Sequence, residues 1–289
     1  VDIGGLLIVA TTIITFVFLV GSLLNPDVFY RGMRGGTELR LGGYMMNPNE
    51  LGMLANIAIG LGITRLFRGI SLLVILAITI NLFVLFETGS RSSVIALGLM
   101  TLFLVLYLGK LKHILFYVGA VIVPVLILIE KVVFKTGAEE VLSMTGRIPF
   151  WGALLTESFS VRPILGHGFM RISDSDVFAG FQTYGGGMAH NTFLQVLLGL
   201  GIIGFVIAIL QFISTLRNVF HKLAGNIFLV SIIVPIVLNS MTEFGIYGMS
   251  NYGVLFWQLV VVYVVVDWSR IDSKIEFGVP GIPDTRSNN

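Results

Sequence analysis

The run SLLVILAITINLFVLF, residues 71–86, decides the fold class, because it carries no charged side chain. Its length is close to the roughly 20 apolar residues that cross a hydrocarbon core as a helix. Similar runs recur, such as TLFLVLYLG from residue 101. Hydrophobic residues make up 55% of the 289 residues and charged residues 12%, a balance that excludes the mixed polar surface of a water-soluble domain. The sequence therefore predicts an integral membrane protein with several spans.

Apolar runs between charged or Gly/Pro-rich breaks predict an all-α, polytopic transmembrane bundle of about eight helices. The expected spans are residues 4–24, 49–66, 69–87, 92–109, 114–131, 189–211, 225–242 and 250–268. They form one expected transmembrane domain, residues 1–270, and residues 271–289 are an expected disordered cytoplasmic tail. Because the chain opens on Val1, we expect a truncated or processed N-terminus.

Short loops set the expected orientation. Arg65 and Arg68, Lys110 and Lys112, Arg217 and Lys222, and the tail with Arg270 and Lys274 all fall on one side. By the positive-inside rule this side is cytoplasmic, so residues 25–48 and 132–188 are expected outside a bacterial inner membrane. These two segments are the long loops, and long loops without structure of their own often carry function, so chemistry is expected there.

Composition also bounds cofactors and partners. The absence of cysteine excludes disulfides, cysteine-based zinc sites and thiol nucleophiles, and a net charge of +2 is too small to indicate a nucleic-acid partner. We expect no metal and no cofactor. Asp174 and Asp176 in RISDSD leave a metal-dependent glycosyltransferase open, although two loop aspartates are usually just solvated.

The first candidate motif is TGSRSS, residues 88–93, an expected tight turn between two spans. Ser90 can cap the next helix, which places Arg91 in its first turn. A cation there faces the positive end of the helix dipole, an arrangement that becomes favourable when an anion lies between them. The alternative is an arginine that reaches lipid phosphates.

The second motif, TGRIPFWGALLTESF at residues 145–159, predicts a short helix in the membrane interface. Phe150, Trp151, Leu154 and Leu155 are expected on one face of it. Arg147 stands at its start, where it is either an anion ligand or an ordinary interfacial arginine.

The third motif, GGGMAHNTFLQVLLGLGIIG at residues 185–204, places His190 at the start of a span, with Asn191 and Thr192 able to cap it. A histidine at this depth is uncommon, and its neutral imidazole can accept a proton near pH 7, as a general base must. The alternative is a histidine that is hydrogen-bonded to a loop carbonyl.

The fourth motif is LRLGGYMMNPNELG, residues 39–52. Asn47 and Asn49 can cap the following span, and Arg40 would lie beside the same surface. Asn-Pro-Asn is equally typical of a plain turn and cap. Taken together, the four helix starts, two bearing arginine and one histidine, predict a diphosphate site with a base nearby, because the guanidinium fork suits phosphate oxygens.

With these residues the sequence resembles the O-antigen ligase and Wzy-type polysaccharide polymerase family. The matching pieces are NPNELG at 47–52, TGSR at 88–91, GR before Trp151, PILGHGF at 163–169 and HNTFLQVLLGLGIIG at 190–204. The resemblance implies transfer of a glycan from undecaprenyl diphosphate to an acceptor hydroxyl on the periplasmic face. It implies inversion without a metal, and an acceptor that is the lipid A core or a growing polysaccharide.

The family's essential residues match Arg91, Arg147 and His190, which are therefore the expected catalytic residues. Substrate contacts are expected from the residues around them, namely Arg40, Asn49, Ser90, Trp151, His167 and Asn191. His167, in Gly-His-Gly, is interpreted as a turn position whose side chain is replaceable. Glu243 is a weaker candidate acid or base and is rather expected to pair with an outer arginine, and Glu87 could orient Arg91.

Two other functions stay open. A polymerase joins repeat units and uses the same donor, and this sequence does not separate it from a ligase. A transporter or flippase for an anionic lipid-linked substrate would line a path with the arginines. Against a transporter, the expected spans lack mid-bilayer charges and paired broken helices.

Overall fold

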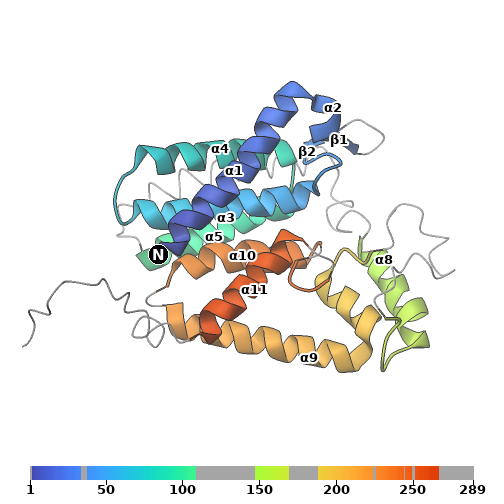
Figure 1. Ribbon diagram of the computed structural model, residues 1–289. Coiled ribbons are helices and arrows are strands. Elements are labelled where there is room, and N and C mark those ends of the chain that lie inside the picture. The colour runs from blue at the N-terminus through green and yellow to red at the C-terminus, as the bar shows by residue number, and fades with distance from the viewer. Residues whose placement is uncertain are drawn as a thin grey trace, which may run out of the picture.

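The computed structural model describes residues 2–33, 38–108, 147–168, 188–223, 226–243, 245–248 and 251–266, which are mostly helical (Figure 1). The elements in chain order are α1 (Ile3–Leu24), α2 (Pro26–Phe29), β1 (Tyr30–Met33), β2 (Glu38–Leu41), α3 (Pro48–Leu66), α4 (Leu72–Thr88), α5 (Arg91–Leu108), α8 (Arg147–Ala153), α9 (Thr192–Lys222), α10 (Phe228–Ser240) and α11 (Tyr252–Val265). The expected span 114–131, the pair Asp174 and Asp176, and the tail 271–289 lie outside the described residues.

Helices occur at seven of the eight expected spans. By length and composition, two helices in the described part of the chain can cross a membrane, α1 with a mean hydropathy of 2.6 and α9 with 2.7. Four further apolar helical stretches are shorter, with 10–17 residues each, namely Leu72–Thr88, Arg91–Tyr107, Phe228–Ser240 and Tyr252–Val265. The number of spans is therefore not confirmed as eight.

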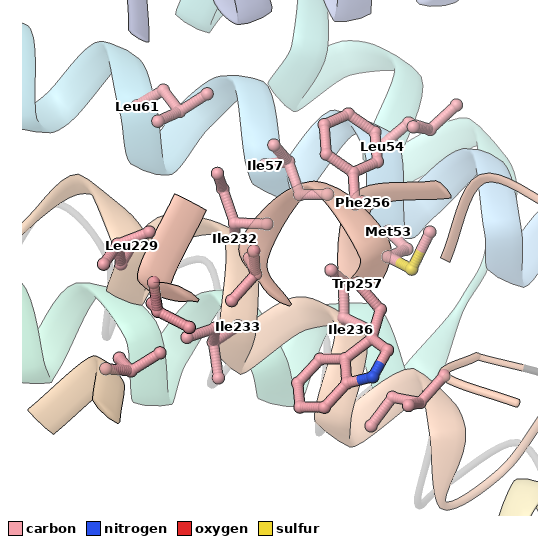
Figure 2. Packing of buried hydrophobic residues seen from close by; sticks show 14 of the residues in the cluster. Met53, Leu54, Ile57, Leu61, Leu229, Ile232, Ile233, Ile236, Phe256 and Trp257 are labelled. Atoms are coloured by element: carbon pink, nitrogen blue, oxygen red, sulfur yellow. The ribbon is translucent and has the colours of Figure 1, made fainter. Parts of the chain in front are cut away.

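Helix α3 is the centre of the bundle, and α1, α4, α5 and α10 surround it. Figure 2 shows Leu54 and Ile57 of α3 beside Ile232 of α10 and Phe256 of α11 in one apolar cluster. A Cβ atom at Gly60 would collide with Met100 of α5, so the absence of a side chain there lets the two helices approach closely. This packing fixes the ends of α3, α5 and α10 relative to one another.

The two ends of the bundle differ in their side chains. At one end Arg65 pairs with Asp2 over 3.1 Å, and Leu223 packs in the same cluster as Ile63. The opposite end, called the site end here, is where α3, α5, α8 and α9 begin. The structure thus gathers the expected site motifs at one end, away from Arg65.

The expectation of a purely helical chain needs one correction at the site end. Strands β1 and β2 form an antiparallel hairpin in which Tyr30 pairs with Leu41 and Arg31 with Arg40. The pairing continues where Gly42 N–H donates to the Phe29 carbonyl. Leu41 is fully buried, so the hairpin lies against the bundle and carries Arg40 with it.

The expected span 189–211 is also corrected. Helix α9 begins at Thr192, is interrupted at Gly201, and continues to Lys222. Figure 1 shows its first part set at an angle to the longer second part. Residues 202–222 alone extend over about 31 Å, the thickness of a hydrocarbon core. The first part, residues 192–200, is therefore available to build the site end.

Candidate active site

The side chain of Glu243, in the loop after α10, joins four segments at the site end. It is 4% exposed. Its Oε1 atom accepts hydrogen bonds from Arg147 Nη2 at 2.8 Å and Asn49 Nδ2 at 2.7 Å. Its Oε2 atom contacts His190 Nδ1 at 2.9 Å and accepts from Asn47 Nδ2 at 3.3 Å. The structure thereby brings together three of the residues expected in the site, and the expected pairing of Glu243 with an arginine is confirmed.

His190 is held at the start of α9 in an unusual backbone conformation. Its φ is +48°, and in the described ranges it is the one non-glycine residue with a positive φ. Such a conformation is costly for a residue with a side chain and persists where its surroundings impose it. Here Thr192 Oγ1 donates to the Glu243 carbonyl at 3.2 Å, and Asn191 Nδ2 donates to the Met241 carbonyl at 3.3 Å. These contacts fix the two residues that follow His190 to the loop that carries Glu243.

Asn191 also has its expected role as the N-cap of α9. Its Oδ1 atom accepts from the backbone N–H groups of Phe193 and Leu194, both at 3.0 Å. Because one side chain satisfies two helix-end donors and bonds the Met241 carbonyl, it ties the start of α9 to the loop after α10.

The charge of Glu243 is stabilised by its neighbours. Burial alone would raise the pKa of this carboxyl. The hydrogen bond from His190, the charge that His190 carries when it is protonated, the charge of Arg147 and the hydrogen bond from Asn49 outweigh burial and hold the pKa of Glu243 below its ordinary value. The carboxylate is therefore the form that the site favours near neutral pH.

Arg40 and Asn49 connect this cluster to the turn between α4 and α5. Arg40 donates from Nε to the Thr88 carbonyl at 2.6 Å and from Nη2 to Asn49 Oδ1 at 3.0 Å. The expectation that Asn49 caps α3 is wrong, because Asn47 is the N-cap and accepts from the Asn49 N–H at 2.9 Å. The Asn49 side chain instead bridges Arg40 and Glu243.

The expected cap at Ser90 is confirmed, since its Oγ accepts from the Ser93 N–H at 3.3 Å, and α5 begins at Arg91. Ser93 Oγ contacts the Asn49 carbonyl at 3.5 Å, so the starts of α5 and α3 lie together. Glu87 accepts a hydrogen bond from Tyr30 Oη at 2.7 Å, which gives this carboxylate a partner in the hairpin.

Helix α8 is docked through its aromatic face. Trp151 Nε1 donates to the Ala189 carbonyl at 2.7 Å, next to His190. Phe150 and Leu154 are buried beside Ala189, whereas Leu155 is 42% exposed, so the expected apolar face is wrong at Leu155. The reason is that α8 changes to a π-helical turn at Leu154–Ser158, which rotates the following side chains.

His167 contacts the turns that follow α8 and the first part of α9. Its Nε2 bonds the Ser158 carbonyl at 2.8 Å, and its backbone N–H donates to Leu198 in α9 at 2.9 Å. The flanking Gly166 and Gly168 have φ values of +69° and +84°, which confirms the expected tight turn. Within the described ranges, no group of three or more His, Asp or Glu side chains is placed to hold a metal ion.

These features define a helical protein with apolar, membrane-type helices and, at one end, an Arg–Glu–His cluster around a buried carboxylate. Residues 72–209 match the family model described as O-antigen ligase, which confirms the predicted resemblance to this family. No curated protein matches the chain. The family is membrane-associated and acts in O-antigen or polysaccharide assembly on lipid-linked substrates.

The matched segment includes Arg91, Arg147 and His190, and it ends before Glu243. From the sequence, Glu243 was only a weaker candidate acid or base and an expected partner of an arginine. The available signal was an acidic residue in an otherwise apolar turn, which is costly to bury unless it is paired.

Proposed function

We propose that this protein is an O-antigen ligase-like glycosyltransferase. It transfers a glycan from undecaprenyl diphosphate to a hydroxyl of the lipid A core on the periplasmic face of the inner membrane. The observation that carries this proposal is the buried Glu243 carboxylate, which contacts both Arg147 and His190. A cationic donor for phosphate oxygens and a proton acceptor are thus held side by side, inside a chain whose family works on lipid-linked polysaccharide.

Arg147 and Arg91 are the proposed ligands of the diphosphate. Arg147 contacts Glu243 through Nη2, and a guanidinium carries five N–H donors in a planar fork. A carboxylate on one branch orients the plane so that other N–H groups can point at phosphate oxygens. Arg91 adds a second guanidinium at the start of α5, a helix of 18 residues, where helix-end N–H groups favour an anion.

His190 is the proposed general base. A carboxylate accepts hydrogen bonds, so a neutral His190 in contact with Glu243 carries its hydrogen on Nδ1. In this tautomer Nε2 holds the lone pair and takes the proton of the acceptor hydroxyl. The hydroxyl oxygen then forms a bond to the anomeric carbon as the bond from that carbon to the diphosphate oxygen breaks. Attack opposite the leaving group inverts the anomeric configuration.

The leaving diphosphate gains negative charge in this step, and the two arginines stabilise that charge without a metal. An alternative role for His190 is to donate a hydrogen bond to a phosphate. The roles differ in pH dependence, because a base acts when neutral and a phosphate donor acts equally well or better when protonated.

The break in α9 is a feature that transporters share, and it was not expected from the sequence. In transporters the exposed backbone of such a break binds the substrate or ion. Here Leu198 and Gly199 carbonyls accept from the N–H groups of His167 and Gly168, at 2.9 and 2.8 Å. Because the backbone of the chain itself occupies the break, this feature supports the enzyme over the transporter.

Purified protein in lipid nanodiscs tests the proposal with an undecaprenyl-diphosphate glycan as donor. Two acceptors are offered separately, lipid A core and a second molecule of lipid-linked repeat unit. A glycan joined to lipid A core supports the ligase, and a lengthened lipid-linked glycan supports a Wzy-type polymerase. If neither product forms while the protein is folded and the donor is intact, the proposed function is wrong.

A further inference from the structure

The segment that contains residues 163–168 is bonded into the break of α9 by an exchange of backbone hydrogen bonds. In a continuous helix the Leu198 and Gly199 carbonyls would accept from the N–H groups four residues later. Instead they accept from His167 and Gly168, while the N–H groups of Ile202 and Ile203 donate to the Pro163 and Ile164 carbonyls at 2.9 and 3.4 Å. Residues 163–168 together with 198–203 are called the clasp here.

The clasp depends on residues without a side chain at its contact points. Gly201 has φ +64° and ψ −168°, a conformation that is essentially restricted to glycine, and a Cβ atom there would collide with the Ile164 carbonyl. A Cβ atom at Gly166 would lie 2.5 Å from the Gly199 carbonyl group. The clasp therefore closes only with glycine at both positions.

The clasp connects the two segments that carry the proposed catalytic groups. The first part of α9 follows directly on His190, and residues 163–168 follow the helical turns that begin at Arg147. His167 anchors these turns, because its Nε2 bonds the Ser158 carbonyl at 2.8 Å. Since a carbonyl only accepts, Nε2 is the donor in this contact. Phe159 also packs in the same apolar cluster as Leu198.

We propose that the clasp is a positioning device for the transfer reaction, and that His167 is a positioning residue that never contacts the substrate. This inference rests on the proposed function. The clasp fixes the angle between residues 192–200 and the span 202–222, and it fixes α8 against both. In that way it sets the distance between Arg147 and His190 at which donor and acceptor meet.

Spin labels on this cysteine-free chain measure the clasp directly. Cysteines replace Ile148 on α8 and Val206 on the span, which are 49% and 48% exposed. Double electron–electron resonance then gives the distribution of distances between the two labels. We expect a narrow distribution in the labelled parent and a broad one in Gly201→Ala. Gly152→Ala is the matched control, because a Cβ there meets nothing within 4 Å, and its distribution should stay narrow.

His167 variants separate positioning from substrate contact without changing the backbone. His167→Ala removes the anchor to Ser158, so it should broaden the distribution and lower transfer about tenfold or more, because small misplacements of reacting groups are costly. His167→Gln can donate at the same reach as Nε2, and we expect it to restore both readouts. Loss of transfer in His167→Ala with an unchanged distance distribution would assign His167 to substrate binding and overturn the inference.

A normal distance distribution and normal transfer in Gly201→Ala would equally overturn it. A parent protein that transfers no glycan would instead refute the proposed function, and the distance measurements would still decide whether the clasp fixes α8.

Discussion

Nδ1 of His190 lies 2.9 Å from Oε2 of Glu243, although 53 residues separate them in the chain. The same carboxylate contacts Arg147 through its other oxygen at 2.8 Å. One buried anion thus orients an imidazole and a guanidinium together. Glu243 determines which ring nitrogen carries hydrogen and which way the guanidinium plane faces, and both are requirements of the proposed transfer.

Replacing Glu243 by Gln tests this arrangement. The amide keeps the size of the side chain but loses the charge that holds His190 and Arg147. We expect glycan transfer to fall by roughly 100-fold while membrane insertion is retained, because a base in the wrong tautomer cannot take the proton. The measurement is the rate of glycan transfer in nanodiscs.

Glu157→Gln is the matched control for this change, since Glu157 is an exposed carboxylate that follows α8. It should transfer glycan at the parent rate. Equal rates in Glu243→Gln and Glu157→Gln would show that the buried carboxylate has no part in the reaction.

The lowered pKa of Glu243 predicts how stability depends on pH. A carboxyl whose folded-state pKa is depressed contributes stability above its unfolded value, about 4.3, and loses it as pH falls further. The midpoint temperature of thermal unfolding in detergent should therefore decrease as the pH is lowered below about 4.3. This decrease should be smaller in Glu243→Gln. If the midpoint temperature decreases equally with pH in the two proteins, the carboxylate is not stabilised by its neighbours.

Arginine geometry is tested by Arg91→Lys and Arg147→Lys. Each lysine keeps the positive charge but loses the planar fork, so we expect a loss of transfer of roughly 100-fold with unchanged protein levels. Arg162→Lys, at an exposed position after the helical turns, is the control and should be neutral. If Arg91→Lys and Arg147→Lys both transfer glycan at nearly the parent rate, these arginines are ordinary interfacial residues.

Topology is tested by single cysteines in the cysteine-free chain. Arg162 and Arg68 are both exposed, and the positive-inside rule places them on opposite sides of the membrane. An impermeant thiol reagent added to intact cells should label Arg162→Cys and leave Arg68→Cys unlabelled until the cells are broken. Labelling of Arg68→Cys in intact cells would reverse the orientation and move the site to the cytoplasm.

The helices of the bundle could be predicted from the sequence because apolar runs are sufficient to mark them. The expected span 4–24 corresponds to α1 at Ile3–Leu24, and 69–87 to α4 at Leu72–Thr88. The hairpin of β1 and β2 escaped prediction, since its strands have only four residues each. The break at Gly201 could not be predicted either, because hydropathy carries no information about the backbone conformation inside an apolar run.

The candidate site was predictable as far as it consists of polar residues at helix starts. Arg147, His190 and Asn49 were identified in this way, and the structure brings all three to Glu243. The position of Glu243 at the centre could not be predicted, because tertiary packing of α3 against α10 decides which loop meets which helix start. The role of Asn49 as a bridge follows from the same packing.

The most direct test of the account measures donor retention and turnover separately in His190→Ala. The protein is reconstituted with labelled undecaprenyl-diphosphate glycan and an acceptor, and the parent rate is followed across about pH 5 to 8, where histidines titrate. If His190 is the base, parent transfer rises with pH over this range, and His190→Ala retains the donor but does not turn it over. Normal turnover in His190→Ala would contradict the account, and loss of donor retention would assign His190 to phosphate binding.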